Sequence, residues 1–100
     1  MVICALTVRK LKPGTFEEFR KAFMADESAE GMPPGSQFFM IRNSGDPDEV
    51  ICFGLFDGTL EELRGSSAYS GYDEQLAAIA PLVESVGADG MYEVVERQSA

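Results

Sequence analysis

Two tyrosines and one arginine are the side chains best suited to proton-transfer or anion chemistry: Tyr69, Tyr72 and Arg42. A tyrosine hydroxyl can donate to a ligand carbonyl or hold a phenolate, and an arginine can stabilise the negative charge of a carbanion or enolate. The chain has no histidine, which excludes Ser-His and Cys-His nucleophile systems and histidine-bound metal or haem. These three residues are the candidate catalytic groups, and no metal or other cofactor is expected.

Each candidate also has a structural interpretation. Tyr72 suits a core-lining position on a helix, and Arg42 suits a strand end or a contact between subunits. The Gly-Ser-rich segment that holds Tyr69 lacks the lysine of a phosphate-binding loop, so nucleotide binding has no support. Asp46 and Asp48 suggest a calcium loop, but the glycine and bidentate glutamate that such a loop requires are missing. We interpret these two aspartates as turn residues.

Composition restricts the partners and the compartment. One hundred residues with 45% hydrophobic content predict one small domain over 1–100. A net charge of -9 and eight scattered Lys and Arg residues argue against nucleic acid and anionic membrane partners. The chain has no long apolar run and Met1 leads directly into a strand-like segment, so we expect a cytoplasmic protein. Cys4 and Cys52 sit in apolar strand patterns typical of small buried residues, with a redox or ligand-contacting role as the alternative.

Alternating hydrophobicity predicts the strands that position these residues, and helical periodicity predicts the helices. Strands are expected at 2–9, 37–43, 50–58 and 87–96, with a turn at 44–48 that makes the middle two strands a hairpin. A first helix over 15–27 begins with the capping-box spacing of Thr15 and Glu18. A short second helix begins with the same spacing at Thr59 and ends near Gly65. A third helix begins near Ser70 and is interrupted at Pro81.

The order strand, helix, strand, strand, helix, strand predicts an α+β fold of the ferredoxin-like βαββαβ type. Its four-stranded antiparallel sheet has the helices on one face. The strand at 50–58 is nevertheless apolar on both faces, since Ile51, Phe53 and Leu55 alternate with smaller apolar residues. We therefore expect the second face to meet an identical sheet across a two-fold axis, which makes the protein a homodimer.

Three segments resemble a known family: "LKPGTFEEFRKAF" from Leu11, "IRNSGDPDEVICFGLFD" from Ile41 and "GSSAYSGYDEQLAAIAPLV" from Gly65. They are similar to the dimeric α/β-barrel proteins, and within them to the antibiotic biosynthesis monooxygenase-like domains. The resemblance implies two sheets closed into a barrel, with a pocket in each subunit between sheet and helices. Members include cofactor-free monooxygenases that oxidise phenolic polyketides to quinones, and haem-degrading enzymes.

The departures from the family pattern reduce the number of activities that are expected. Phe56 stands where many members have a tryptophan, and the histidine that often follows on the next helix is absent. Thr7 stands where haem-degrading members have an asparagine on the first strand. Haem degradation is therefore not expected.

The resemblance also implies which residues face the pocket. Cys52, Gly54 and Phe56 would look toward the helices, and small residues on adjacent strands would leave room for a ligand. The alternative is that phenylalanines of the first helix fill this space. The candidate ligand-binding residues are Ala5, Thr7, Phe19, Phe23, Asn43, Cys52, Gly54 and Phe56.

The expected function is that of a cofactor-independent monooxygenase-like protein that binds a small, mostly apolar ligand of phenolic or polycyclic type. The substrate carbanion would reduce dioxygen, and the protein would supply hydrogen bonds and exclude water. The alternative is a non-catalytic ligand-binding or stress-associated dimer that keeps the fold without the chemistry.

Overall fold

The computed structural model describes residues 1–23, 35–65 and 72–99, without the side chains of residues 72 and 73. The described elements follow the predicted order. They are β1 (Val2–Leu11), α1 (Phe16–Phe23), β2 (Gln37–Asn43), β3 (Asp46–Asp57), α2 (Leu60–Arg64), α4 (Tyr72–Ile79), the 3-10 helix η1 (Ala80–Leu82) and β4 (Val83–Glu93).

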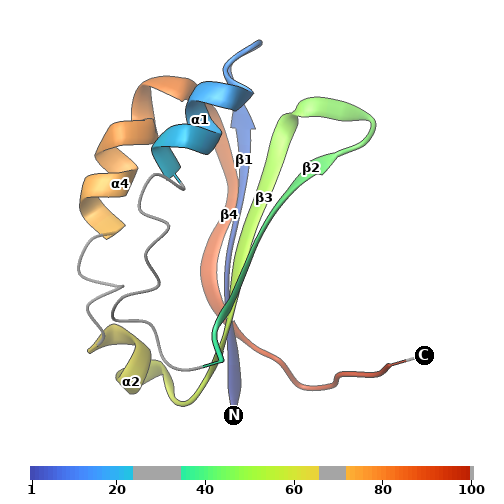
Figure 1. The fold of residues 1–100 in the computed structure, drawn as a ribbon, viewed down its shortest axis with the longest axis vertical. Helices are drawn as coiled ribbons and strands as arrows, with labels where there is room; N and C mark the ends of the chain where they lie inside the picture. The colour runs from blue at the N-terminus through green and yellow to red at the C-terminus, as the bar shows by residue number, and fades with distance from the viewer. Residues whose placement is uncertain (24–34, 66–71, 100) are drawn as a thin grey trace.

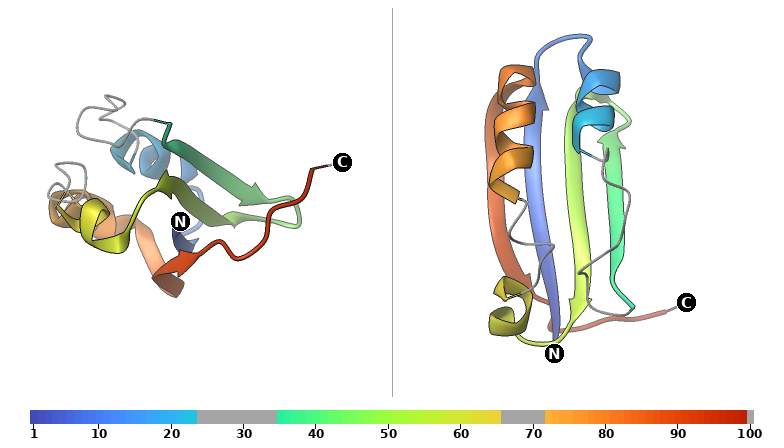
Figure 2. Two further views of the ribbon diagram at one scale, coloured as in Figure 1. Left: turned by 90° about the horizontal axis from the view of Figure 1, so that it is seen from below. Right: turned by 60° about the vertical axis from the view of Figure 1, so that its left-hand side comes forward.

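The four strands form one sheet in the order β2-β3-β1-β4, and every neighbouring pair is antiparallel. Helices α1, α2 and α4 all lie on the same side of this sheet (Figures 1 and 2). This arrangement is the predicted ferredoxin-like α+β fold. The two long central strands, β1 and β3, therefore carry most of the surface that the helices cover.

The alternation along β1 and β3 separates the two faces of the sheet. On β3, Val50, Cys52, Gly54 and Phe56 are buried on the side of the helices, while the alternate residues Ile51, Phe53 and Leu55 are half-buried. On β1 the helix-facing set is Ile3, Ala5, Thr7, Arg9 and Leu11. Phe19 of α1 and Ile79 of α4 complete the main core, so the predicted assignment of faces is confirmed.

The opposite face of the sheet is apolar, and no helix of the described part covers it (Figure 1). Phe39 of β2 stacks on Phe53 of β3 with ring centres 4.8 Å apart. Phe39, Ile41 and Tyr92 are 41%, 47% and 49% exposed. We call this surface the open face. Large side chains of this kind are the ones whose burial in a second contact releases most free energy.

The two predicted capping boxes differ in outcome. At α2 the pair forms: Thr59 Oγ1 accepts from the Glu62 N–H at 3.1 Å, and Glu62 Oε1 accepts from the Thr59 N–H at 3.3 Å. At α1 the prediction is wrong, because the Thr15 hydroxyl instead donates to the Lys12 carbonyl at 2.8 Å. The tight turn before α1, in which Gly14 has φ +77°, brings that carbonyl within reach.

The predicted boundaries of the helices and of the last strand differ in outcome. Helix α1 is described to Phe23, and the rest of its predicted span lies outside the described residues, as does Ser70. Pro81 does interrupt the last helix: α4 ends at Ile79 and the chain passes through η1. The last strand then begins at Val83, four residues earlier than predicted, because the 3-10 turn returns the chain to the sheet at once.

Strand β3 also begins earlier than predicted, at Asp46, and leaves a two-residue turn at Ser44 and Gly45. Pro47 is tolerated there because the pairing with β2 shifts register between Arg42 and Asn43, so the ladder does not use its missing N–H. The hairpin itself was predicted and is confirmed.

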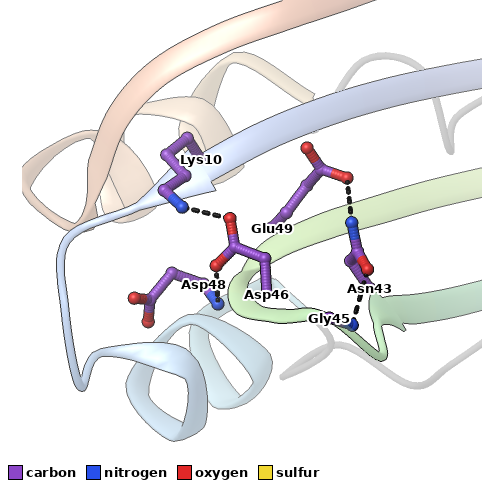
Figure 3. Close-up of polar contacts among 6 residues, drawn as sticks. All are labelled: Lys10, Asn43, Gly45, Asp46, Asp48 and Glu49. Carbon is purple, nitrogen blue, oxygen red and sulfur yellow. Dashed lines mark hydrogen bonds and ion pairs between the residues drawn. The ribbon is translucent and has the colours of Figure 1, made fainter.

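An ion pair closes the hairpin end of the sheet (Figure 3). Lys10 of β1 contacts the Asp46 carboxylate, which also accepts from the Asp48 N–H at 3.1 Å. These two hydrogen bonds hold the pKa of Asp46 below its ordinary value, and the hydrogen bond to Asp46 raises the pKa of Lys10. The side chains of Lys10 and Asp46 are 40% and 33% exposed, so solvent screens the pair.

This pair predicts a pH dependence of stability. The lowered pKa of Asp46 means that its stabilising effect is present at neutral pH and is lost as the pH falls below about 4, the ordinary range of the carboxyl group. Urea unfolding of Asp46→Asn should therefore give a smaller free energy of unfolding than wild type at pH 7, with the difference shrinking as the pH falls below about 4. Asp57→Asn is the control, and an Asp46→Asn difference independent of pH would contradict the assignment.

Candidate functional site

An arginine lies in the interior between the sheet and the helices. Arg9 is 2% exposed, and its Nη1 donates to the Thr7 hydroxyl at 2.8 Å. Its guanidinium carbon lies 5.2 Å from the centre of the Phe23 ring, a cation–π distance. An arginine side chain does not lose its proton at any physiological pH. The interior therefore holds a permanent positive charge.

Strand alternation and a β-bulge position this arginine. Arg9 shares its face with Thr7 and Leu11, because successive side chains on a strand alternate. Val8 pairs with Ala88, but Arg9 pairs with Val86, so Gly87 is an extra residue on β4. Such a bulge locally increases the twist of a strand pair and re-aims nearby side chains. The irregularity therefore lies beside Arg9.

Thr7 and Cys52 lie next to this charge on neighbouring strands. Thr7 is buried, and its hydroxyl accepts from Arg9 and donates to the Cys52 carbonyl at 3.5 Å. Burial raises the pKa of the Cys52 thiol to about 11, against the opposing effect of Arg9. At neutral pH the thiol is therefore protonated and is a poor nucleophile. Its contribution to the site is apolar surface.

The two cysteines lie on opposite faces of the sheet. Cys52 points toward the helices, whereas Cys4 lies on the open face, in register with Leu55. They cannot approach each other within one chain.

Most of the predicted ligand-binding residues come together on the helix-facing side. Thr7 is in register with Cys52, and Ala5 with Gly54. Phe19 and Phe23 of α1 pack with Cys52 in the same cluster, and their rings stack 5.4 Å apart. Phe56 belongs to a second cluster with Ile3 and Leu63. The smaller residues on β1 and β3 thus lie between two apolar clusters.

The space beside Gly54 is occupied. A Cβ atom at this position would lie 2.9 Å from the Phe56 ring and 3.0 Å from the Phe38 ring. These two rings meet edge to face with centres 5.7 Å apart. The room that the glycine leaves is therefore taken by aromatic side chains of β2 and β3, and the ring of Phe38 was absent from the sequence-based account.

Two predicted residues lie elsewhere. Arg42 is exposed, with its guanidinium carbon 4.4 Å from the centre of the Phe16 ring. Asn43 is exposed at the hairpin, where it donates to Glu49 at 3.0 Å and accepts from the Gly45 N–H at 2.8 Å (Figure 3). The structure does not bring either of them to Thr7, and Asn43 stabilises the hairpin turn instead.

Tyr69 lies outside the described residues. Tyr72 is the first residue of α4, and its side chain also lies outside them. The buried arginine, Arg9, was not among the predicted site residues, in which Arg42 was the candidate for stabilising an anionic oxygen. The sequence did contain a signal that Arg9 faces the helices, because Arg9 continues the alternation of Ile3, Ala5 and Thr7.

A hollow of about 310 Å³ opens beside Arg9, between the end of α4 and the start of β4. Among the described residues its walls include Leu76, Ile79, Val83 and Val86. Mostly apolar walls with a few polar groups, here Arg9, Glu84 and Ser85, fit the usual composition of a small-molecule site. The volume falls at the small end of the range for such sites, about 300 to 1,000 Å³.

Comparisons of the sequence with family models and with curated proteins find no match. Comparison of the structure finds solved structures of the same fold. A protein of Chloroflexus aurantiacus, provisionally assigned as an antibiotic biosynthesis monooxygenase, is 15% identical with a TM-score of 0.71, and the match covers 99% of this chain and 98% of that one. A Caulobacter crescentus protein with the same provisional assignment is 18% identical with a TM-score of 0.71, covering 95% and 91%.

A third similar structure, from Bacteroides fragilis, is described as a dimeric protein of unknown function with a ferredoxin-like fold. It is 16% identical with a TM-score of 0.61, and the match covers 93% of this chain and 96% of that one. At these identities the likeness shows that this chain has the fold of those proteins.

Within the described residues, none of the helices has the length and apolar character needed to cross a membrane.

The hydrogen bond between Thr7 and Arg9 predicts a specific loss of stability. Thr7→Val keeps the shape but removes the acceptor for a buried charged donor, which should lower the free energy of unfolding by about 1–3 kcal/mol. Thr7→Ser keeps the hydroxyl and should recover most of this loss. Equal stability of Thr7→Val and wild type in urea unfolding would show that the contact contributes nothing.

Proposed function

We propose that this protein binds a small phenolic ligand between its sheet and helices and oxidises it with dioxygen, without a cofactor. The observation that carries the proposal is the buried guanidinium of Arg9 beside Thr7. The fold shared with proteins provisionally assigned as antibiotic biosynthesis monooxygenases supports the same reaction class.

A buried cation favours the ionised form of a phenol. A phenolic hydroxyl has an ordinary pKa of about 10, and an opposite charge within about 6 Å lowers that value by 1–3 units. The aromatic rings of Phe19 and Phe23 keep water away from Arg9, which strengthens the attraction. Arg9 would thus hold the electron-rich anion that dioxygen attacks.

The proposed reaction balances without an outside reductant. Loss of a proton from a ring CH₂ conjugated with the phenolate gives a carbanion, which transfers one electron to dioxygen. The resulting radicals combine into a hydroperoxide, and its loss of water leaves a carbonyl. The sum is R₂CH₂ + O₂ → R₂C=O + H₂O. Tyr69 and Tyr72 are the proposed donors to the substrate oxygens, and one of them would return the proton.

The proposal includes a homodimer formed through the open face. Phe39, Phe53 and Tyr92 give this face an apolar surface of the kind found at the centre of stable interfaces. The Bacteroides fragilis structure of the same fold is described as dimeric, which supports this assembly. Two such sheets face to face would form a barrel around the two-fold axis.

Oxygen uptake tests the reaction. Purified protein, mixed with a panel of hydroxylated ring compounds that carry an acidic CH₂ group, should consume one dioxygen per carbonyl formed, as followed with an oxygen electrode and by quinone absorbance. Arg9→Met should lower kcat by about 100-fold, the usual effect of removing one group that stabilises an oxyanion. Arg42→Met is the matched control and should keep full activity. Binding of phenols without any oxygen uptake would refute the oxygenase and favour a non-catalytic binding protein.

Tyr69 is the proposed donor that sequence analysis singled out. Tyr69→Phe should lower turnover by about 10- to 100-fold without changing the melting temperature, because it removes one hydroxyl that acts on the substrate. Tyr92→Phe, on the open face, is the control for loss of a tyrosine hydroxyl. Unchanged turnover in Tyr69→Phe would remove this residue from the site.

The open face predicts the effect of one charge on assembly. Phe53→Asp places a carboxylate in the middle of the apolar surface and should convert the dimer to monomer or make the protein insoluble. Ala78→Asp, at an exposed position on α4, should remain dimeric. Sedimentation equilibrium separates the two, and an unaltered Phe53→Asp dimer would show that another surface forms the interface.

A further inference from the structure

The hollow beside Arg9 is lined mostly by apolar residues, with Arg9 as its one positively charged described residue and Glu84 as its negatively charged one. Five of its described lining residues are apolar: Leu76, Ile79, Ala80, Val83 and Val86. They come from α4, η1 and the first residues of β4. Strand β4 is the edge strand of the sheet, on the side of α4 (Figure 2). Glu84 and Ser85, both exposed, complete the described lining.

The charges of the protein make this place unusual on its surface. The chain carries a net charge of -9, which repels small anions from most of its surface. Arg9 is only 2% exposed, yet it is one of the residues that line the hollow. A molecule therefore has to enter the hollow to approach this positive charge, and an anionic group gains most from doing so.

We propose that the hollow is a binding site and entry route for a small aryl anion, a molecule with one or two rings and one ionised oxygen group. The rings lie against Leu76, Val83 and Val86, and the anion points toward Arg9. The inference rests on the proposed function, because Arg9 serves both, and it narrows the substrate class: a hollow of about 310 Å³ suits a one- or two-ring phenolate or carboxylate better than a larger polycycle.

A matched pair of probes tests the anion preference. 1-Naphthoate and 1-naphthamide have the same ring system and nearly the same size, but only the first is charged. The chain has no tryptophan, so naphthalene emission can be followed without overlap. Naphthoate should bind at least about ten-fold more tightly than naphthamide at low salt. Equal affinity of the two probes would overturn the proposal.

Two variants test whether naphthoate binds in the hollow. Ala80→Phe fills the hollow from an exposed position of η1 and should weaken naphthoate binding by about ten-fold or more. Ala78→Phe, exposed on α4 outside the hollow, should leave it unchanged. Naphthoate affinity that is the same in both variants would place the probe elsewhere and overturn the proposal.

Glu84, an exposed residue that lines the hollow, provides an independent check that leaves the core intact. Glu84→Gln removes a negative charge beside the bound anion and should tighten naphthoate binding by about two- to five-fold while leaving naphthamide unchanged. Glu74→Gln, exposed on α4 away from the lining, is the control. If Ala80→Phe fails to fold, this pair alone decides, and no difference between the two glutamine variants would refute the site.

The outcomes separate the two proposals. Naphthoate binding that Ala80→Phe abolishes, in a protein that consumes no oxygen with any phenol, supports the site and refutes the oxygenase. Oxygen uptake that Ala80→Phe leaves unchanged supports the oxygenase and refutes the hollow as its entry route.

Discussion

The structure depends on one geometric constraint: helices from a single chain cover one face of this sheet, although the strands are apolar on both. Burial of apolar area is the main favourable term in folding, so the helix-facing side of β1 and β3 supports the monomer. The open face, where Phe39 stacks on Phe53, also has large apolar side chains, but no described helix covers them. The proposed partner is a second copy, because a two-fold axis would bring identical apolar surfaces together and leave the helices outside.

The same constraint gives Arg9 its importance. A sheet-to-helix interior packs best with apolar side chains, and replacing a buried charge by an apolar residue of similar volume is often neutral or stabilising. Stability alone therefore does not account for the guanidinium beneath α1. Its hydrogen bond to Thr7 and the Phe23 ring reduce the cost of burial, and a bound anion would reduce it further. The chemistry proposed for the protein uses this buried charge.

The sequence predicts the element order and the faces because the two long strands alternate clearly, and side-chain direction on a strand follows from position alone. Local signals are weaker. Thr15 and Thr59 have the same capping spacing, but the turn before α1 offers Thr15 a nearer carbonyl. Val83 continues a helical face in the sequence, yet Pro81 ends the helix before it. Arg9 was missed because a charged residue at the end of an apolar run resembles a strand terminus, whereas β1 continues to Leu11.

The position of free space is the least predictable feature, because a small residue leaves room only if no neighbour takes it. Gly54 is flanked by Phe56 two residues along its own strand, and Phe38 stands opposite it on β2. Both rings turn into the vacant volume. The edge of the sheet differs, since β4 has no further strand beside it and its bulge at Gly87 disturbs the regular pairing next to Arg9. The middle of the sheet is filled by its own aromatic side chains, whereas the hollow lined by Arg9 lies beside β4.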